Sequence, residues 1–278
     1  MPSLAVVALF AAVLPNAVVL EPVANMYSRP SLDADVVSQA IYGANVSILE
    51  EQTGWAHIRT ADQYTGWTPL GALLKARPYA AAASAAQVRS LFAHIYREAS
   101  VTRHAPLLTV PFETRLEIAG GPETDARWLQ VRLPDDRAGW IQAGDIWLHP
   151  KTMTVPETLE LARRFLGLPY TWGGTSSYGY DCSGFSQMLG RRRGLNMPRD
   201  AQPQADWDGV VPVERKQDLQ PGDLLYFGSS AQKITHTGIY LGDGKFIDAT
   251  THETPMVRID DLNDPYWTRL LVAMRRVK

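Results

Sequence analysis

Hydrophobic and polar positions alternate in two similar stretches of the first half of the chain. A tryptophan followed 11 residues later by Gly-Trp occurs at Trp55 and again at Trp128. Short alternating runs surround both motifs: VSILEE, WAHIRT and TGWTPL in the first stretch, and RLEIAG, WLQVRL and AGWIQA in the second. Such runs are typical of half-buried strands. Two units are too few for a solenoid, so the pattern predicts two small β-barrels in tandem.

The pattern changes after residue 150. Thr154 and Glu157 have the spacing of a helix capping box, and apolar positions at helical spacing follow it up to Gly167. A second helical face begins near Cys182. Strand candidates then lie at residues 224–227, 237–241, 245–249, 256–259 and 270–277. Helices followed by an antiparallel meander predict an α+β domain.

These patterns divide the chain into five segments. We predict an N-terminal segment (1–17), a first barrel (18–77), a connector (78–92), a second barrel (93–149) and an α+β domain (150–278). The connector is rich in alanine, which is compatible with a helical or an extended form. A length of 278 residues suits two or three compact domains.

The N-terminal segment allows two interpretations. Residues 4–14 are apolar and as long as the core of a signal peptide, but no positive charge precedes them and no clean cleavage site follows. They are too short to span a bilayer. The segment is either an export signal, which places the protein in the cell envelope or periplasm, or part of a domain in a cytoplasmic protein.

Charge and composition exclude several classes of function. A net charge of −2 argues against nucleic acid as a partner, no Lys/Arg run suggests a basic groove, and we expect a monomer with no membrane span. The single cysteine, Cys182, excludes an intramolecular disulfide and argues against a zinc site built on cysteine. We therefore expect no metal and no cofactor. A lone cysteine is either a buried hydrophobe or a reactive thiol.

The surroundings of Cys182 favour a reactive thiol. A loop rich in Gly and Tyr (171–180) precedes it, and Cys182 lies in the first turn of the expected helix. Free N–H groups and the helix dipole favour a thiolate there. A thiolate nucleophile needs a proton acceptor and donor, and His236 opens a predicted strand, which is a rigid place for one. The sequence therefore predicts a cysteine nucleophile with a histidine base.

Six motifs of the C-terminal domain carry a resemblance to a known family. They are P-Y-T-W-G-G (169–174), D-C-S-G-F (181–185), P-R-D (198–200), Gln204, L-Q-P-G-D-L (219–224) and the strand of His236. The domain resembles the NlpC/P60 family of cell-wall cysteine peptidases. The resemblance implies a papain-like fold with Cys182 as nucleophile and His236 as base. It also implies a bacterial cell-wall (murein) peptide substrate, cut between γ-linked D-glutamate and a diamino acid such as diaminopimelate or lysine.

The third polar residue departs from the family. Its members usually have His, Asn or Gln within a run resembling F-I-H-A, whereas this chain has Asp248 in F-I-D-A. The resemblance therefore makes Asp248 the third catalytic residue, and a carboxylate can hold the imidazole tautomer and stabilise imidazolium. In the alternative, Asp248 is a turn residue and a backbone carbonyl orients His236.

The two repeats resemble bacterial SH3-type (SH3b) domains, and the first repeat does so more closely. SH3b units ahead of this peptidase domain are similar to a subgroup that trims short murein peptides with a free N-terminal L-alanine. In that subgroup Tyr170, Asp181 and Ser183 correspond to residues that hold the alanine ammonium, with Asp181 as the counter-charge. The first SH3b unit would close the pocket with Tyr64 and Asp35.

Two other functions stay open at this point. The same Cys–His pair serves murein amidase or acyltransferase chemistry in related folds. The SH3b pair could instead act alone in a non-catalytic wall-binding protein, although an intact Cys182 and His236 argue against this. Ala201 stands where the peptide-trimming subgroup has a serine, and this departure concerns specificity.

Overall fold

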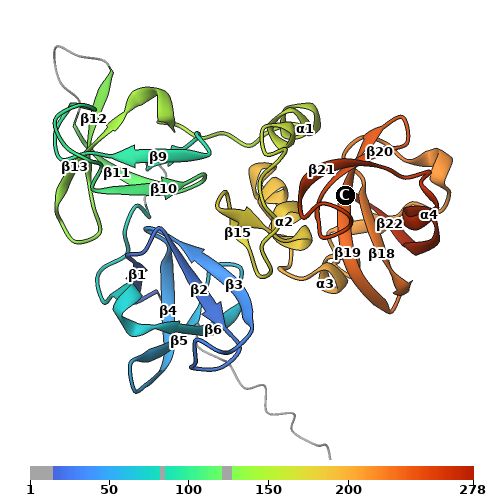
Figure 1. Cartoon of the computed structure of the whole chain (residues 1–278), viewed down its shortest axis with the longest axis horizontal. Coiled ribbons are helices and arrows are strands. Elements are labelled where there is room, and N and C mark those ends of the chain that lie inside the picture. The colour runs from blue at the N-terminus through green and yellow to red at the C-terminus, as the bar shows by residue number, and fades with distance from the viewer. Residues whose placement is uncertain (1–14, 82–84, 121–126) are drawn as a thin grey trace, which may run out of the picture.

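The computed structural model describes residues 15–81, 85–120 and 127–278 (Figure 1). Strands dominate these ranges, and the four α-helices found in them all lie after residue 150. The strands form three larger sheets, of which the first two correspond to the two sequence repeats. This composition confirms the mixed α+β class. The apolar residues 4–14 lie outside the described ranges.

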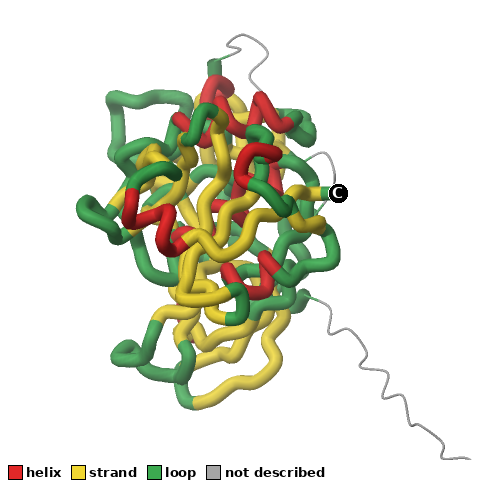
Figure 2. The backbone as a smooth tube through the Cα atoms, turned by 90° about the vertical axis from the view of Figure 1, so that its right-hand side faces the viewer, coloured by secondary structure: helices red, strands yellow, loops and turns green. Residues whose placement is uncertain are grey.

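The first repeat forms a seven-stranded antiparallel sheet. The order across it is β3 (Val36–Ile41), β2 (Val23–Tyr27), β6 (Thr65–Pro69), β5 (Trp55–Arg59), β4 (Asn45–Gln52), β1 (Ala17–Val19) and β7 (Leu73–Leu74). A 3-10 turn, η1 (Leu70–Ala72), joins β6 to β7. Ala56 and Ile58 of β5 are fully buried and alternate with partly exposed residues, as predicted. Figure 2 shows this sheet as the lower end of the molecule, built from strands and loops.

The second repeat has the same strand connectivity. Its five-stranded sheet has the order β13 (Ala138–Gln142), β12 (Trp128–Arg132), β11 (Arg115–Gly120), β8 (Ala86–Val88) and β14 (Ile146–Trp147), with η2 (Ala143–Asp145) before β14. The strands β9 (Phe92–Ile95) and β10 (Leu108–Pro111) pair beside it. β8 pairs with β11 and β14, just as β1 pairs with β4 and β7. A bridge between Tyr96 and Trp140 matches the pairing of Tyr27 with Trp67.

The glycine of each Gly-Trp motif lies where a second strand passes closely. A Cβ at Gly66 would be 2.9 Å from the Cβ of Met26, and a Cβ at Gly139 would be 2.6 Å from Cγ2 of Ile95. Real Cβ atoms do not approach neighbours so closely, so glycine is required at both positions. The shared motif therefore reflects a shared packing contact in the two repeats.

Two sequence-based expectations differ from the structure. The hydrogen-bonded order of the described strands is open at both ends in each repeat, so two closed barrels are not confirmed. The connector expected over residues 78–92 contains β8, which belongs to the second sheet. Ala86 and Val88 are fully buried there. A three-residue strand depends on its two neighbours for stability, and no local pattern in an alanine-rich segment reveals them.

The C-terminal part is a six-stranded antiparallel sheet with helices around it. Across the sheet run β17 (Val210–Pro212), β22 (Leu271–Val277), β18 (Leu224–Ser230), β19 (Lys233–Gly242), β20 (Lys245–Thr250) and β21 (Met256–Asp261), and a hairpin of β15 (Thr175–Ser176) and β16 (Gly179–Tyr180) stands apart. The helices are α1 (Val155–Arg163), α2 (Cys182–Arg192), α3 (Ala201–Ala205), α4 (Pro265–Leu270) and the 3-10 turn η3 (Lys216–Asp218). The predicted strands and both predicted helices are confirmed.

Helix α2 is the central element of this part. It lies between the two N-terminal sheets and the six-stranded sheet, whereas α4 lies at the far side of that sheet (Figure 1). Phe185, Met188 and Leu189 of α2 are fully buried in the main apolar core, together with Ile239 and Ile247 of the sheet. The apolar spacing noted in the sequence therefore fixes which side of α2 faces the sheet.

Candidate active site

Cys182 is the first residue of α2, as the sequence predicted. Asp181 is the N-cap, and its side chain accepts a hydrogen bond of 2.7 Å from the N–H of Gly184. This cap begins the helix at Cys182 and leaves the N–H groups of its first residues without intrahelical acceptors. Cys182 is a free thiol with only 7% of its surface exposed.

His236 and Asp248 lie next to each other across two paired strands. Nε2 of His236, on β19, is 2.6 Å from Oδ2 of Asp248, on β20. The thiol of Cys182 lies close enough to His236 to raise the pKa of its imidazole. With Nε2 engaged by Asp248, Nδ1 is the ring nitrogen left for the thiol. Three residues that are far apart in the sequence thus form a continuous Cys–His–Asp series.

A glycine makes room for this contact. Ile239 pairs with Ile247, so the antiparallel register brings Gly238 opposite Asp248. A Cβ at Gly238 would be 2.7 Å from Cδ2 of Phe246 and 3.2 Å from Cβ of Asp248. Without that Cβ, the carboxylate can reach diagonally to His236, two residues along the same face of β19.

The electrostatics of the pair favour a protonated histidine. Burial opposes the charge on His236, but the attraction and hydrogen bonds of Cys182 and Asp248 outweigh it and raise the pKa of His236 to about 10. Burial also raises the pKa of Asp248 to about 6, although His236 acts to lower it. Between these values the pair is imidazolium and carboxylate, which suits a thiolate at Cys182.

Aromatic rings hold the imidazole from the side. Trp267 of α4 stacks on His236 at a centroid distance of 5.1 Å and an interplanar angle of 27°. Phe227 of β18 lies 5.7 Å from the same imidazole, and Phe227 and Trp267 also contact each other. The side chain of His236 is 16% exposed. This packing restricts the imidazole to one orientation.

Asp181, predicted to be the counter-charge for the substrate's amine, already has a cationic partner within the protein. Its carboxylate forms a two-pronged ion pair with Arg199, with N–O distances of 3.0 and 2.6 Å. Arg199 also donates to Ser183 Oγ at 2.9 Å and to Ser38 Oγ of β3 at 3.2 Å. Arg199 is only 3% exposed. The charge of Asp181 is therefore already balanced within the protein, and Ser183 is part of the same buried network.

Tyr170 lies close enough to Cys182 for the two side chains to interact electrostatically. Burial, followed by the charges of Cys182 and Asp181, raises the pKa of Tyr170 well above its usual range. The hydroxyl therefore stays protonated and can donate a hydrogen bond. Trp172, two residues further along the same loop, is the most exposed large side chain near the site, with 70% of its surface accessible.

The first repeat reaches the site through Tyr64. The hydroxyl of Tyr64 donates to Oδ2 of Asp200 at 3.1 Å, and burial together with Asp200 raises the pKa of Tyr64 to about 12. Asp200 is exposed and directly follows the buried Arg199. Asp35 is exposed as well, and its neighbour Val36 packs against the loop that leads to Cys182. The sequence shows Asp200 only as part of the P-R-D motif, because its partner Tyr64 is 136 residues away.

Both N-terminal sheets are attached to the helix of the nucleophile. Gln187 of α2 donates to Asp62 of the first repeat at 2.9 Å. One turn later, Arg191 bonds to Glu113 of the second repeat at 2.8 Å. Arg192 donates to Gln87 of β8. A single helix therefore carries Cys182 at its start and contacts both repeats along its second half.

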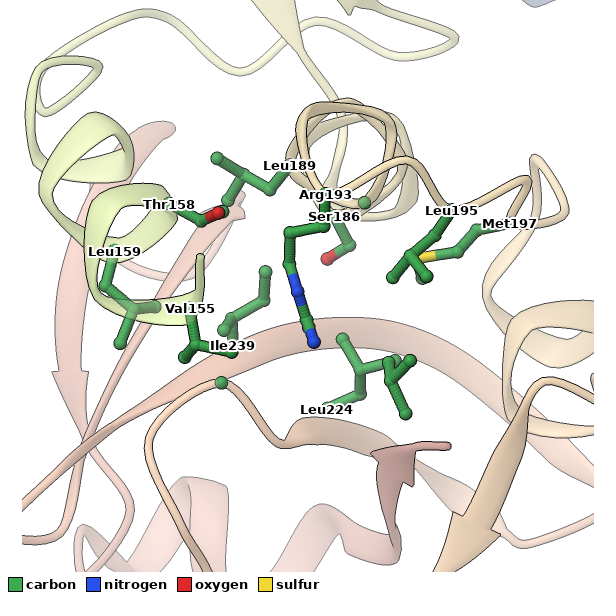
Figure 3. A pocket seen from close by; sticks show the side chains of 13 residues that line it. Val155, Thr158, Leu159, Ser186, Leu189, Arg193, Leu195, Met197, Leu224 and Ile239 are labelled. Atoms are coloured by element: carbon green, nitrogen blue, oxygen red, sulfur yellow. The ribbon is translucent and has the colours of Figure 1, made fainter. Parts of the chain in front are cut away.

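Two cavities lie away from the Cys182–His236 pair. One of about 20 Å³ lies between α1, α2 and the sheet, and Figure 3 shows the side chain of Arg193 entering it among apolar neighbours. It is large enough for about one water molecule. The other, of about 600 Å³, lies where the three parts of the chain meet and includes Arg192 and Glu113 in its lining. Neither includes Cys182 or His236 in its lining.

No three His, Cys, Asp or Glu side chains of residues 15–81, 85–120 and 127–278 gather closely enough to bind a metal ion. Within the same ranges, no helix is sufficiently long and apolar to cross a bilayer.

Two family models match separate parts of the chain. The model of the NlpC/P60 family matches residues 167–276, a range that contains Cys182, His236 and Asp248. The model described as the bacterial dipeptidyl-peptidase Sh3 domain matches residues 26–73, within the first repeat. The second repeat lies between these two ranges.

Individual proteins extend the likeness over most of the chain. A gamma-D-glutamyl-L-lysine dipeptidyl-peptidase from Bacillus cereus is 29% identical over 256 residues, which cover 86% of this chain and 74% of that protein. A probable endopeptidase from Haemophilus influenzae is 35% identical over 127 residues, or 45% of this chain and 76% of that protein. The crystal structure of an NlpC/P60 family protein from Bacillus cereus matches with a TM-score of 0.81 at 25% identity, covering 94% of this chain and 99% of that one. The chain therefore belongs to the NlpC/P60 family of cysteine peptidases and carries a bacterial SH3 domain ahead of its peptidase domain.

Proposed function

We propose that the protein hydrolyses the bond between γ-D-glutamate and a diamino acid in short murein peptides that have a free N-terminal L-alanine. The observation that carries this proposal is the position of Cys182 at the start of α2, in contact with the His236–Asp248 pair. Relatives from Bacillus cereus and Bacillus subtilis that match most of this chain are named gamma-D-glutamyl-L-lysine dipeptidyl-peptidase. Their name supports the same scissile bond here.

The proposed reaction is nucleophilic catalysis through an acyl-enzyme. The Cys182 thiolate attacks the γ-carbonyl carbon of D-glutamate, and the free N–H groups at the start of α2 face the oxyanion that forms. The C–N bond then breaks as imidazolium of His236 gives its proton to the leaving amine. Water, deprotonated by His236, hydrolyses the thioester and releases the L-Ala-D-Glu product. Asp248 holds Nε2 and stabilises the imidazolium in both half-reactions.

We expect Asp248→Ala to lower kcat about 100-fold with little change in KM, since the carboxylate acts only on the imidazole. Asp248→Asn and Asp248→His should retain part of the rate, because both can still bond to Nε2. In the unmodified protein, kcat/KM should fall as the pH drops through about 6, where Asp248 gains a proton. Steady-state kinetics of the three variants over pH 4–9 provide the measurement, and an alanine variant with unchanged kcat would contradict a role for Asp248.

The free amine of the substrate requires a carboxylate that the protein has not already neutralised. Asp181 is paired with Arg199, whereas Asp200 is exposed and bonded only through Oδ2 to the Tyr64 hydroxyl. We therefore assign the counter-charge to Asp200. Tyr170 and Tyr64 would add hydrogen bonds, and Asp35 lies at the edge of the first repeat nearby. Arg199 and Ser183 would support this pocket from within.

The two repeats would then form part of the peptidase rather than act as separate binding modules. We assign the second repeat to a second SH3-type unit, because its strand pairings reproduce those of the first. We propose that the first unit ends near residue 78 and that the second unit, which includes β8, ends near residue 150, where the peptidase domain begins. The contacts of Gln187 and Arg191 attach both units to α2. Such attachment favours a role for the two units as a fixed side of the substrate pocket over a role in targeting the protein to the cell wall.

The proposal is tested by incubating the protein with L-Ala-γ-D-Glu-meso-diaminopimelate and with the corresponding L-Lys tripeptide. Mass spectrometry should show L-Ala-D-Glu and the free diamino acid as the products. Release of L-alanine would instead place the cut at the L-Ala–D-Glu bond, and transfer of the acyl group to added amines would show acyltransfer. Binding of intact peptide without hydrolysis would support a wall-binding protein.

A further inference from the structure

A group of charged side chains lies behind Asp248, on the side away from the nucleophile. Asp248 pairs directly with Arg258 of β21 in the antiparallel ladder. Directly opposite residues of such a ladder have their Cβ atoms about 5 Å apart on the same face. Arg258 also contacts Asp260 at 2.6 Å and Glu253 at 3.2 Å. One guanidinium thus pairs with two carboxylates and stands opposite a third, that of Asp248.

Two carboxylate oxygens in this group lack a partner. Oδ1 of Asp248 and Oδ2 of Asp260 are buried and have no hydrogen-bond partner among the residues that the structure describes. Both side chains lie on one face of the β20–β21 pair, because Asp248 pairs with Arg258 and Asp260 is two residues further along. Two buried negative charges repel each other strongly when nothing compensates them.

We propose that Arg258 is a positioning residue for the reaction, whose guanidinium keeps the Asp248 carboxylate charged and therefore able to hold the His236 imidazolium. The inference rests on the proposed function, in which Asp248 has this task. The residues that the family usually has at this position, His, Asn or Gln, do not need a negative charge to bond to the imidazole. Asp248 does need a negative charge for this task, and it must carry that charge in a fully buried position.

The neighbours of Asp248 act in opposite directions. On the side of the reaction, the charged and titratable groups are Cys182 and His236. The groups on the opposite side are Arg258, Asp260, His252 and Glu253. Arg269 of α4 is stacked over Tyr266. Burial raises the pKa of Asp248 most, Asp260 raises it further, and Arg258 lowers it. Arg258, on the strand next to Asp248, favours the ionised form of that carboxyl.

The test compares pH profiles of kcat/KM for Arg258→Gln, Arg258→Lys and Asp260→Asn on the tripeptide. Arg258→Gln should move the acid limb of the profile upward by about one pH unit and lower kcat at pH 5 about tenfold, with KM nearly constant. Asp260→Asn should move the limb downward, because it removes a negative charge. Arg258→Lys should leave the limb close to that of the unmodified protein. Lys245→Gln is the matched control, since Lys245 pairs with Asp261 at the other end of the same two strands.

A second background separates this role from mere support of the fold. In Asp248→Asn the third residue has no charge to protect, so adding Arg258→Gln should change kcat less than twofold and leave the pH profile unchanged. An equal loss in both backgrounds would overturn the proposal and leave Arg258 a structural residue. The carboxyl carbon NMR signal of Asp248 gives a readout that does not need hydrolysis: Arg258→Gln should raise the pKa of Asp248, and an unmoved titration would overturn the proposal. Failure of the unmodified protein to cleave the tripeptide would contradict the proposed function instead.

Discussion

Cys182→Ala should abolish hydrolysis of the tripeptide, with kcat/KM lower by about four orders of magnitude or more. Cys182 is the only thiol of the chain, so no second cysteine can substitute for it. The loss should be confined to the chemical step, because the alanine side chain still fits the start of α2. Binding of the tripeptide, measured by calorimetry on the inactive variant, should therefore persist.

Chemical labelling tests the same assignment independently. Iodoacetamide should attach one group per chain and remove activity in proportion to labelling, because the protein offers a single thiol. In His236→Ala the labelling should slow at neutral pH, since the thiolate loses its imidazolium partner. Ser186→Ala is the control on the same helix: its hydroxyl has no hydrogen-bond partner among the described residues, and its loss should not affect the rate. Full activity of Cys182→Ala would rule out the cysteine mechanism.

The parts of the site that the sequence predicted are those that local chemistry determines. An Asp cap, a following apolar helical face and a glycine-rich loop are all close to Cys182 in the chain, and together they specify the start of α2. The capping box of Thr154 and Glu157 is confirmed for the same reason. The series from Cys182 to His236 and Asp248 came from the family resemblance, because no local pattern tells which strand will pair with which.

The features that sequence analysis missed depend on contacts between distant segments. The pair of Asp181 and Arg199 joins residues 18 apart, and the bond of Tyr64 to Asp200 joins the first repeat to the peptidase domain. Asp181 looks like a free carboxylate next to the nucleophile until the buried guanidinium is placed beside it. Neither amino-acid type nor spacing reveals such a partner, whereas tertiary packing decides whether the carboxylate is available to a ligand.

Asp181 is paired with a buried arginine and Asp200 is exposed, so we expect opposite effects when each aspartate is replaced by asparagine. Asp181→Asn keeps a side chain able to cap α2 but leaves the buried Arg199 without its counter-charge. That change should destabilise the protein by about 3–5 kcal/mol, which thermal unfolding would detect. Asp200→Asn removes an exposed charge whose loss should leave the unfolding temperature nearly unchanged. If Asp181→Asn left stability intact and impaired only the binding of free-amine peptides, the original assignment to Asp181 would stand.

Acetylation of the substrate's N-terminal alanine should lower kcat/KM by about 1000-fold in the unmodified protein. The bound peptide would cover Asp200 and Tyr64, and a carboxylate that is covered without a cationic partner costs about 3–5 kcal/mol. Asp200→Asn should therefore reduce the turnover of the free peptide strongly and that of the acetylated peptide only slightly, so that the two substrates become nearly equal. Competition between both peptides in one reaction, followed by mass spectrometry, measures the ratio of their kcat/KM values directly. Equal turnover by the unmodified protein would show that the pocket is open beyond the alanine, and the two repeats would then be better explained as a module that binds the cell wall.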